Sequence, residues 1–408
     1  MDDRSLYQTI LGLKAPWYVN SVEVRIEDEE VWVFLERDKQ QDLVCPECGR
    51  VCPGYDRSPE RRWRHLDTCQ YRTVLVARIP RVQCPEHGVR QITIPWGEDR
   101  SRFTALFEAT AIRLLQETTL LGLTRIMGLS WDEAEGIMRR AVARGLARRE
   151  DRPVRLIGVD ETSFQKRHEY VTVASDLERS CVQWVGDGRG KETLEQYWAG
   201  CSEKQKGELE QVVLDMWEPY INATTEALPD GYERIVFDHF HVVKHLNDAV
   251  DRVRRAEHRK LREMGDERLT GTKHAWLKGQ RRRNRRDLAT IRKIRDSGLK
   301  VGRAWAIKEA ALKLWTYRSV TWARKYFDRW YFWATHSRLD PIIKVAKMMK
   351  RHLKGILNYI KSGATNATAE AINSKIQEIK YCARGYRNRA NFRMAIMFHC
   401  GGLDMNPC

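Results

Sequence analysis

Three short segments, far apart in the chain, each carry a carboxylate in a setting suited to metal-dependent chemistry. Asp160 and Asp215 each follow an aliphatic run, and Glu370 lies near the start of an expected helix. An aliphatic run that ends in a polar residue is typical of a buried strand whose last side chain lies at the carboxyl edge of a sheet. Two Asp and one Glu supply the oxygen ligands that hard cations such as Mg²⁺ or Mn²⁺ prefer. Since two such cations catalyse phosphodiester chemistry, the trio predicts a DNA-strand transferase.

A second set of reactive residues forms two turns of nearly the same sequence, Cys-Pro-Glu-Cys-Gly and Cys-Pro-Glu-His-Gly. Alternating stretches between them, such as 71–78, are typical of ribbon strands. Three cysteines and a histidine fill the tetrahedral coordination of a structural zinc, so we expect this Zn²⁺ to fold the module and not to catalyse. Cys52 and Cys69 lack the pattern and receive no ligand role. The four candidate zinc ligands are Cys45, Cys48, Cys84 and His87.

The segment after these turns predicts three helices. Helical apolar spacing covers 105–115, and a second short helix covers 120–127. Ser130 and Glu133 form a capping box that opens an amphipathic helix over 131–146. A helix, a tight turn and a helix rich in arginine resemble a helix-turn-helix that reads the DNA major groove. The alternative is a helical hairpin whose basic face contacts only water. The candidate DNA contacts of this module are Arg139, Arg140 and Arg144.

The overall charge agrees with a polyanionic partner. The chain has 408 residues, with 72 Lys and Arg against 55 Asp and Glu, a formal net charge of +17. Such an excess favours nucleic acid through counterion release, although a well-solvated surface would also carry it. No apolar run approaches the roughly 20 residues that span a bilayer, and the acidic opening is unlike a signal peptide. We therefore expect a cytosolic protein whose ten cysteines are zinc ligands or buried thiols, not disulfides.

From Val154 the pattern changes to strands. In order, we expect strands at 154–160, 169–176 and 181–185, a helix at about 191–197, a strand ending at Asp215, a helix at about 217–228 and a strand at 234–238. This order is that of the ribonuclease-H-like α/β fold. In that fold the first and fourth strands lie side by side and a later helix crosses near them. Asp160 and Asp215 would then adjoin, and Glu370 could join them.

Residues from about 242 to 362 are expected to form an inserted helical subdomain, because Gly and Pro are sparse and the stretch is too long for a loop. Its tryptophans at near-helical spacings are Trp305, Trp315, Trp322, Trp330 and Trp333. They are most simply its core, although one could stack on a flipped base. For its basic run we favour phosphate contacts over a solvated face. The candidates there are Arg281, Arg282, Arg283, Arg285 and Arg286.

Several motifs together resemble the ISL-three (ISL3) family of bacterial insertion-sequence transposases. They are Gly-Val-Asp-Glu-Thr-Ser-Phe at 158–164, Asp-His-Phe-His-Val-Val-Lys at 238–244, and the segment 366–373 with Ile-Lys at 379–380 and Gly-Tyr-Arg-Asn at 385–388. The zinc turns and the helix-turn-helix lie where that family's N-terminal DNA-binding modules would lie. The resemblance implies a DDE transposase whose metal-binding Asp, Asp and Glu map onto Asp160, a later Asp and Glu370. Ala371 replaces a common Gly, which a helix should tolerate.

Two residues compete for the place of the second Asp. Asp238 lies in the more recognisable motif but ends the fifth expected strand, whereas Asp215 ends the fourth, beside Asp160. In related transposase groups the fifth strand carries a Cys/Asp-x-x-His element that supports the site, and 238–241 resembles it. We therefore assign catalysis and magnesium binding to Asp215, with Asp238 as the alternative. His241 is either a supporting contact of the site or a core histidine that hydrogen-bonds the sheet.

The expected domains are a zinc-binding ribbon at 1–100, a helix-turn-helix at 101–152, the first part of a ribonuclease-H-like core at 153–241, an all-helical insertion at 242–362, and the part of the core with the catalytic Glu at 363–408. The N-terminal modules would bind the terminal repeats of a mobile element. Further phosphate contacts after the catalytic helix are expected at Lys380, Arg384 and Arg387.

The expected function is a transposase that cuts and joins DNA. Because two ends must be joined, we expect double-stranded DNA of the element and of its target as partners, and a homodimer or larger homo-oligomer. No membrane partner is expected, and the place is the bacterial cytoplasm, in association with the nucleoid. The alternatives are a catalytically silent DNA-binding regulator and a ribonuclease-H-like nuclease that cuts without joining.

Overall fold

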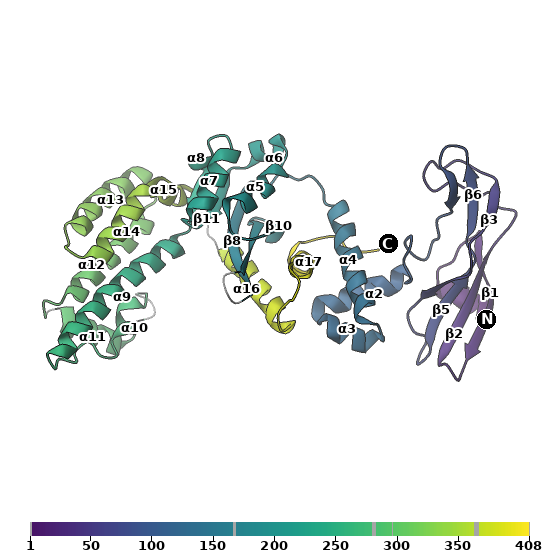
Figure 1. The fold of residues 1–408 in the computed structure, drawn as a ribbon, viewed down its shortest axis with the longest axis horizontal. Helices are drawn as coiled ribbons and strands as arrows, with labels where there is room; N and C mark the ends of the chain where they lie inside the picture. The colour runs from purple at the N-terminus through teal and green to yellow at the C-terminus, as the bar shows by residue number, and fades with distance from the viewer. Residues whose placement is uncertain (1, 166–168, 280–282, 296, 363–366, 408) are drawn as a thin grey trace. The chain divides into compact units, whose positions relative to one another are not determined.

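The computed structural model describes residues 2–165, 169–279, 283–295, 297–362 and 367–407, and Figure 1 shows its elements. The chain divides into two compact units. Unit 1 comprises residues 1–150 and 403–408, and unit 2 comprises residues 151–402. Unit 2 therefore interrupts unit 1 in the sequence. Among the helices of the described ranges, none combines the length and the apolar character that crossing a bilayer requires.

Unit 1 begins with a helix and two small sheets. Their elements are α1 (Asp3–Ile10), β1 (Trp17–Arg25), β2 (Glu30–Arg37), β3 (Gly54–Arg57), β4 (Arg61–Arg64), β5 (Arg72–Ala77), β6 (Pro80–Cys84) and β7 (Gly88–Gln91). The strand orders are β1-β2-β5-β4 and β3-β6-β7. The rings of Trp17 and Trp63 both pack edge-on against Trp96, in the centre of the core. This core supports the strands that lead to the Cys-rich turns.

Three helices follow: α2 (Ala105–Glu117), α3 (Leu120–Met127) and α4 (Trp131–Ala147). They confirm the three helices predicted from the sequence. Gly128 ends α3 with a left-handed φ of 62°, a conformation that glycine adopts without strain. The predicted capping box is present, since the Ser130 hydroxyl accepts from the Glu133 backbone and the Glu133 side chain accepts from the Ser130 backbone. The turn between α3 and α4 is therefore built by local sequence.

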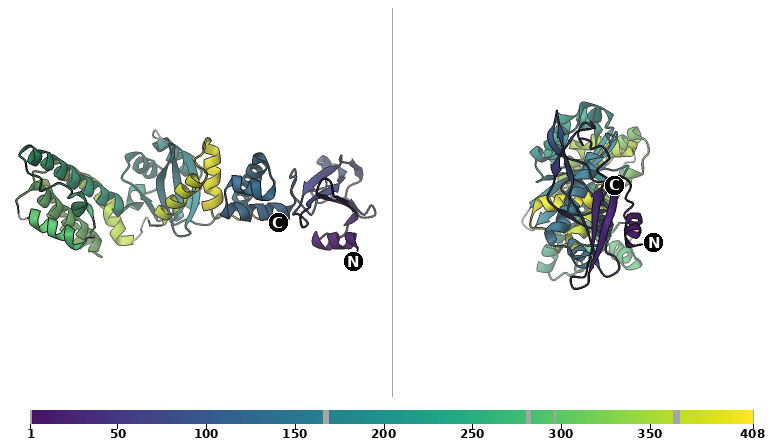
Figure 2. Two further views of the ribbon diagram at one scale, coloured as in Figure 1. Left: turned by 90° about the horizontal axis from the view of Figure 1, so that it is seen from below. Right: turned by 90° about the vertical axis from the view of Figure 1, so that its right-hand side faces the viewer.

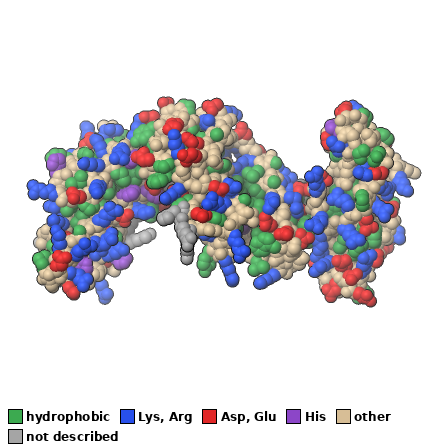
Figure 3. Space-filling model, viewed as in Figure 1, with side chains coloured by type: hydrophobic (Ala, Val, Ile, Leu, Met, Phe, Trp, Pro, Cys, Tyr) green, Lys and Arg blue, Asp and Glu red, His purple; other side chains and the backbone are tan. Residues whose placement is uncertain are grey.

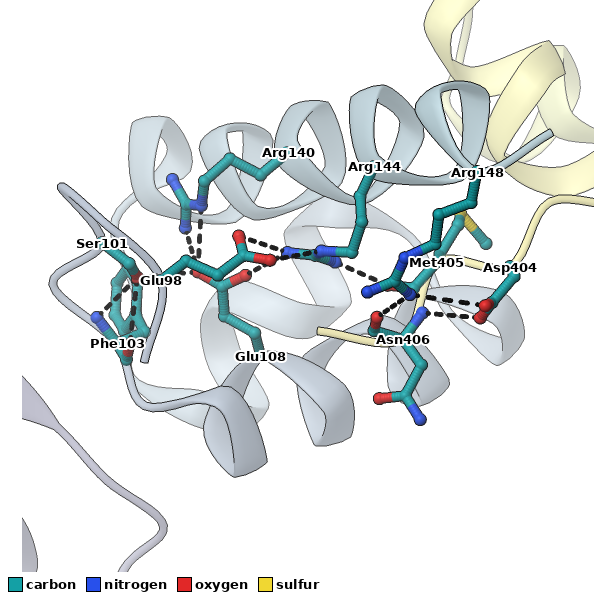
Figure 4. A network of polar contacts seen from close by, with 10 residues as sticks. All are labelled: Glu98, Ser101, Phe103, Glu108, Arg140, Arg144, Arg148, Asp404, Met405 and Asn406. Atoms are coloured by element: carbon teal, nitrogen blue, oxygen red, sulfur yellow. Dashed lines mark hydrogen bonds and ion pairs between the residues drawn. The ribbon is translucent and has the colours of Figure 1, made fainter. Parts of the chain in front are cut away.

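The segment 403–407 packs against α4 within unit 1. A Cβ on Gly145 would lie 2.6 Å from the Cβ of Leu403, so only glycine allows this approach. The Arg144 guanidinium donates to the backbone carbonyl of Met405, and Arg148 donates to that of Asn406, both at 2.5 Å (Figure 4). Residues 403–408 thus belong to the N-terminal unit, whereas the sequence analysis grouped them with the catalytic core.

Unit 2 is built on one five-stranded sheet in the order β10-β9-β8-β11-β12. Its strands are β8 (Leu156–Gln165), β9 (Glu169–Asp176), β10 (Cys181–Asp187), β11 (Gln211–Leu214) and β12 (Ile235–Phe237). β8, β9 and β10 are antiparallel neighbours, while β8, β11 and β12 run parallel. The expected succession of strands and helices is confirmed. One detail was wrong: β8 continues to Gln165, because it pairs with β9 along this length, so Asp160 lies in mid-strand.

Helices cover both faces of the sheet (Figures 1 and 2). Ile157, Val159, Val212 and Leu214 point to the face packed by α5 (Lys191–Ala199) and α7 (Glu218–Ala227). The opposite face holds Val213 and Val236 against Ala369 of α16 (Ala367–Cys382), and Phe164 against Phe392 of α17 (Arg389–Cys400). Two short helices, α6 (Glu203–Glu208) and α8 (Gly231–Arg234), precede β11 and β12. Even-numbered β8 residues therefore face α16.

The described residues of 242–362 are mainly helical, as predicted from the sequence. The elements of this helical subdomain are α9 (His239–Glu263), α10 (Lys273–Leu277), α11 (Arg285–Arg295), α12 (Lys300–Leu312), the 3₁₀ turn η2 (Lys313–Thr316), α13 (Val320–Thr335), α14 (Asp340–Arg351) and α15 (Leu353–Ser362). Trp276, Trp330 and Phe327 are buried in its core. Lys and Arg side chains are numerous on its surface in the view of Figure 3. α9 begins directly after β12, with Asp238 as the residue between them, so the helical stretch follows the polar edge of the sheet in the sequence.

Candidate active site and metal centre

The structure brings the four predicted zinc ligands together. Their ligand atoms all lie within 4.8 Å of one another. The Cys48 and Cys84 sulfurs are 3.7 Å apart, and His87 Nδ1 lies 3.5 Å from Cys84 Sγ and 3.8 Å from Cys45 Sγ. A tetrahedral zinc, with Zn–S of about 2.3 Å and Zn–N of about 2.1 Å, separates its ligand atoms by about 3.6–3.8 Å. The cluster therefore has the dimensions of a structural zinc site.

Local sequence explains this geometry. Gly49 and Gly88 end the two turns with φ of 70° and 68°. This left-handed conformation lets the backbone reverse direction directly after each pair of ligands. His87 Nε2 lies 3.5 Å from the Glu47 carboxylate. A carboxylate on the second ring nitrogen fixes the orientation of a metal-binding imidazole. Four protein ligands leave no open position, so this centre is structural.

The acidic residues of unit 2 form a row across three parallel strands. In the register of the sheet, Val213 of β11 pairs with Gly158 of β8 on one side and with Val236 of β12 on the other. Asp160, Asp215 and Asp238 each follow one of these three paired residues by two positions. Because side chains alternate between faces, all three belong to the face that α16 covers. Asp215 is the middle member of this row.

Asp160 is held by its neighbours on both sides. One carboxylate oxygen accepts from the Glu161 backbone at 2.7 Å, and the other accepts from the Asn373 amide of α16 at 2.5 Å. Burial raises the pKa of Asp160 to about 6, and the nearby carboxylates of Glu161 and Asp215 act in the same direction. Burial disfavours the charged form of such a carboxyl group, and a cation bound beside it would favour that form.

Asp215 pairs with a histidine from the start of α9. His241 Nδ1 lies 3.2 Å from Asp215 Oδ2. Burial alone would raise the pKa of Asp215, but the hydrogen bond and charge of His241 hold it below its usual value. Reciprocally, the hydrogen bond to Asp215 raises the pKa of His241. His241 thus contacts the carboxylate of Asp215 directly.

Asp238 has a different setting. It is 3 % exposed, and its Oδ1 accepts from the Phe240 backbone at 3.1 Å as the N-cap of α9. Its Oδ2 is buried and has no hydrogen-bond partner among the described residues. An orphaned carboxylate oxygen beside Asp215 suits a cation as well as the other oxygens do. This observation keeps Asp238 as the alternative second Asp, although its capping role already accounts for its position.

Glu370 lies in the first turn of α16 and is exposed. The next turns of the same helix contact β8. Asn373 donates to Asp160, Gln377 donates to the Thr162 hydroxyl, and Lys380 Nζ donates to the Ser163 carbonyl at 2.7 Å. Residues three and four apart share a helix face, so Glu370 lies one turn before Asn373 along this face. The carboxylates of this edge offer oxygen ligands, the kind that hard divalent cations prefer.

Sequence reasoning missed several residues at this edge. Asn373 lies in the motif 366–373 but received no role of its own, and Gln377 carried no signal except its spacing of seven from Glu370. The Arg189 guanidinium lies 3.6 Å from Glu161, 4.4 Å from the Tyr170 ring centre and 5.4 Å from that of Trp217. Trp217 follows Asp215 by two residues, yet Arg189 comes from a distant loop, which only the fold brings near.

The three predicted DNA-contacting arginines of α4 differ in their exposure and in their ion pairs. The Arg139 side chain is 69 % exposed and pairs with Glu135. Arg140 pairs with Glu108, while Arg144 is 7 % exposed and pairs with both Glu108 and Glu98 (Figure 4). Arg144 is therefore committed to contacts inside unit 1. Among these three, Arg139 is the side chain that is open to a partner.

The other basic residues predicted to contact DNA also differ in their exposure. Arg281 and Arg282 lie outside the described residues. The Arg283 side chain is 3 % exposed, pairs with Glu309 and lies over the ring of Trp305. The exposed members of the predicted set are Arg285, Arg286, Arg384 and Arg387. Phosphate contacts stay a prediction for these four, while Lys380 is engaged with β8.

Comparison with known proteins gives three family matches in chain order. Residues 42–87 match the zinc-finger of transposase IS204/IS1001/IS1096/IS1165, residues 92–142 match the helix-turn-helix domain of transposase family ISL3, and residues 157–396 match the ISL3 DDE transposase family, described as transposase.

Two curated relatives are similar over nearly their whole length. The transposase for insertion sequence element IS1557 of Mycobacterium tuberculosis is 26% identical over 413 residues, covering 94% of this chain and 92% of the relative. The transposase for insertion sequence element IS1001 of Bordetella parapertussis is 26% identical over 400 residues, covering 97% of this chain and 98% of the relative. The similarity thus includes the zinc cluster, the helical hairpin and the sheet.

Proposed function

The chain belongs to the ISL3 family of transposases, and from this premise we propose that it cuts the ends of an insertion-sequence element and joins them to target DNA. The observation that carries the proposal is the row of acidic residues on neighbouring parallel strands, beside a helix that presents Glu370. Phosphodiester cleavage and strand transfer need carboxylates gathered at one edge. Neither the regulator nor the nuclease gains a specific observation in its favour.

We infer that the sheet of unit 2 is a ribonuclease-H-like core interrupted by the helical insertion. The strand order β10-β9-β8-β11-β12 supports this. On one side of β8, β9 runs antiparallel to β8 and β10 runs antiparallel to β9, and on the other side β11 and β12 run parallel to β8. The proposed domain limits are those of the sequence analysis, except that residues 403–408 are grouped with unit 1.

In the proposed site, Asp160, Asp215 and Glu370 would hold Mg²⁺ or Mn²⁺. When bound, two such cations activate the attacking water or 3′-hydroxyl and stabilise the leaving oxygen. The chain's own residues orient these ligands. Asn373 fixes the Asp160 carboxylate by donating to one oxygen, and His241 fixes Asp215 in the same way. Neighbours that orient a ligand are part of its function even though they do not bind the metal.

The proposed partners are double-stranded element ends and target DNA. Unit 1 would recognise the ends through its zinc ribbon and helix-turn-helix, with Arg139 as the exposed arginine of α4. Exposed arginines after α16, Arg384 and Arg387, would neutralise phosphates near the cut. Since two ends are joined in one reaction, the active form would be a homodimer or larger, working in the bacterial cytoplasm at the nucleoid.

The test uses the full-length protein and labelled duplex DNA taken from the sequences that flank its gene. With Mg²⁺, the wild type should nick the ends and join them to a target plasmid. Asp160→Asn, Asp215→Asn and Glu370→Gln should each abolish both steps while end binding and folding persist, because each removes one negative ligand. A wild-type protein that binds without cutting would support the regulator, and one that cuts without joining would support the nuclease.

A further inference from the structure

Three large aromatic side chains stand exposed on one helix of the inserted subdomain. On α13, Phe332 is 65 % exposed, Trp322 is 59 % exposed and Trp333 is 42 % exposed. The prediction that the tryptophans form the core is therefore wrong for Trp322 and Trp333, whereas Trp330 of the same helix is buried. Exposed aromatic residues that are gathered on one element are typical of an interaction site.

The buried side of α13 already has its partners. Trp330 Nε1 donates to the carbonyl of Ile307 in α12 at 2.9 Å, and Phe327 is 1 % exposed within the same core. Ala323 and Ala334 lie on that side as well and are fully buried. The helix is thus fixed by its inner face. Its outer face is free to serve another purpose.

That outer face alternates aromatic and basic residues. Trp322, Lys325, Arg329, Trp333 and His336 follow one another at spacings of three and four, so they form one stripe along the helix. The two indoles are eleven residues apart, which is about 16 Å along the axis. Lys325 Nζ lies 4.9 Å from the centre of the Trp322 ring. The stripe therefore offers flat rings and positive charges within reach of one extended ligand.

The charges on this stripe are available. The acidic residue of the helix, Asp328, pairs with Lys350 of α14 at 3.2 Å. Among the described residues, no carboxylate lies within ion-pair distance of Lys325 or Arg329. An apolar protein partner would not need these two cations, since they would lose water without gaining a counter-charge. A polyanion with flat faces satisfies both the charges and the rings.

We propose that the α13 stripe, made of Trp322, Lys325, Arg329 and Trp333, binds unpaired DNA, with bases stacked on the indoles and phosphates paired with the cations. Base stacking on aromatic side chains is tolerant of sequence and is combined with a basic track in proteins that hold single strands. The inference rests on the proposed function, because cutting and joining strands is what would present unpaired nucleotides to this subdomain. The stripe then retains a strand that has left its duplex.

The test measures the affinity of full-length protein for a fluorescein-labelled oligothymidine of about twelve nucleotides, a length within the site sizes of single-strand binders. Trp322→Ala/Trp333→Ala should weaken binding about 5- to 140-fold per lost stacking contact. Trp322→Phe/Trp333→Phe should retain most of the affinity. Lys325→Gln/Arg329→Gln should reduce the slope of log affinity against log salt by about 1.4, while Arg303→Gln on α12 should leave it nearly unchanged.

Three outcomes would overturn the inference. Unchanged affinity of the alanine double variant, with an unchanged circular dichroism melt, would exclude stacking. A changed elution volume without a change in DNA affinity would make the stripe a contact between copies of this chain. Loss of affinity by the phenylalanine variant equal to that of the alanine variant would indicate altered packing. If the wild type binds the oligothymidine but cuts no element ends, the proposed function fails and the stripe stands.

Discussion

Arg144 provides a sharp test of how unit 1 is held together. Its side chain is 7 % exposed and reaches two carboxylates, Glu98 at 2.6 Å and Glu108 at 3.1 Å, and the Met405 carbonyl at 2.5 Å. Arg144→Met keeps an unbranched, mostly apolar side chain and removes the guanidinium and its charge. Breaking a buried ion pair on one side costs about 3–5 kcal/mol, because the partner charge stays buried. Arg140 still pairs with Glu108, so we expect the lower end, about 3 kcal/mol.

This loss is large enough to measure. Unit 1 contains about 150 residues, and for a domain of that size 1 kcal/mol shifts the melting temperature by about 2–4 °C. Arg144→Met should therefore lower the unit 1 transition by about 6–12 °C in calorimetry of the full-length zinc-loaded protein. The matched control is Arg139→Met, which loses only a surface pair with Glu135 and should shift it by a degree or so. The control should instead weaken end binding.

A second substitution makes the reasoning refutable. Adding Glu108→Gln to Arg144→Met should recover part of the lost stability, because a neutral amide needs no cation beside it. Arg140, whose side chain is 33 % exposed, can turn to water when Glu108 is neutral. A shift of less than about 2 °C for Arg144→Met, an equal shift for Arg139→Met, or a further loss in the double variant would each show that this network does not stabilise unit 1.

Three further predictions concern the zinc, a buried histidine and the second Asp. The wild type should contain one zinc per chain by metal analysis, and Cys84→Ser should lose it and unfold the ribbon, since the bound metal supplies folding free energy. Burial lowers the pKa of His65 from 6.5 to about 4; the unfolded chain therefore takes up a proton first, and unit 1 should lose up to about 3 kcal/mol as pH falls from 6.5 to 4. His65→Asn, which can still bond to Thr104, should flatten this dependence in pH-resolved melts. Asp238→Asn should lower strand cleavage about 10- to 100-fold, as expected for a residue that orients others, whereas Asp215→Asn should abolish it; the reverse result would place Asp238 in the catalytic trio.

Local signals in the sequence were sufficient for several elements. The Cys-rich turns specify their own geometry within five residues, and the Ser130–Glu133 capping box starts α4 where it was expected. The same holds for the succession of strands and helices, since each has its own periodicity. These features require no knowledge of which segments meet in space.

Features that depend on distant segments could not be predicted in this way. Asp160 was placed at a strand end because the aliphatic run before it ends there, but pairing with β9 continues the strand to Gln165. Arg144 gave no sign of burial, since its partners Glu98 and Glu108 lie 46 and 36 residues away. Spacings of three and four fitted Trp322 to a core and to a surface equally well, and only the packing of α13 distinguished them.

The return of residues 403–407 to α4 imposes an order on how the protein is made. A ribosome releases residues 1–150 first, then the roughly 250 residues of unit 2, and only afterwards the segment whose carbonyls receive Arg144 and Arg148. Unit 1 therefore reaches its final form after unit 2 has been synthesised. A chain interrupted within unit 2 would carry a zinc ribbon and a helical hairpin without the segment that completes them.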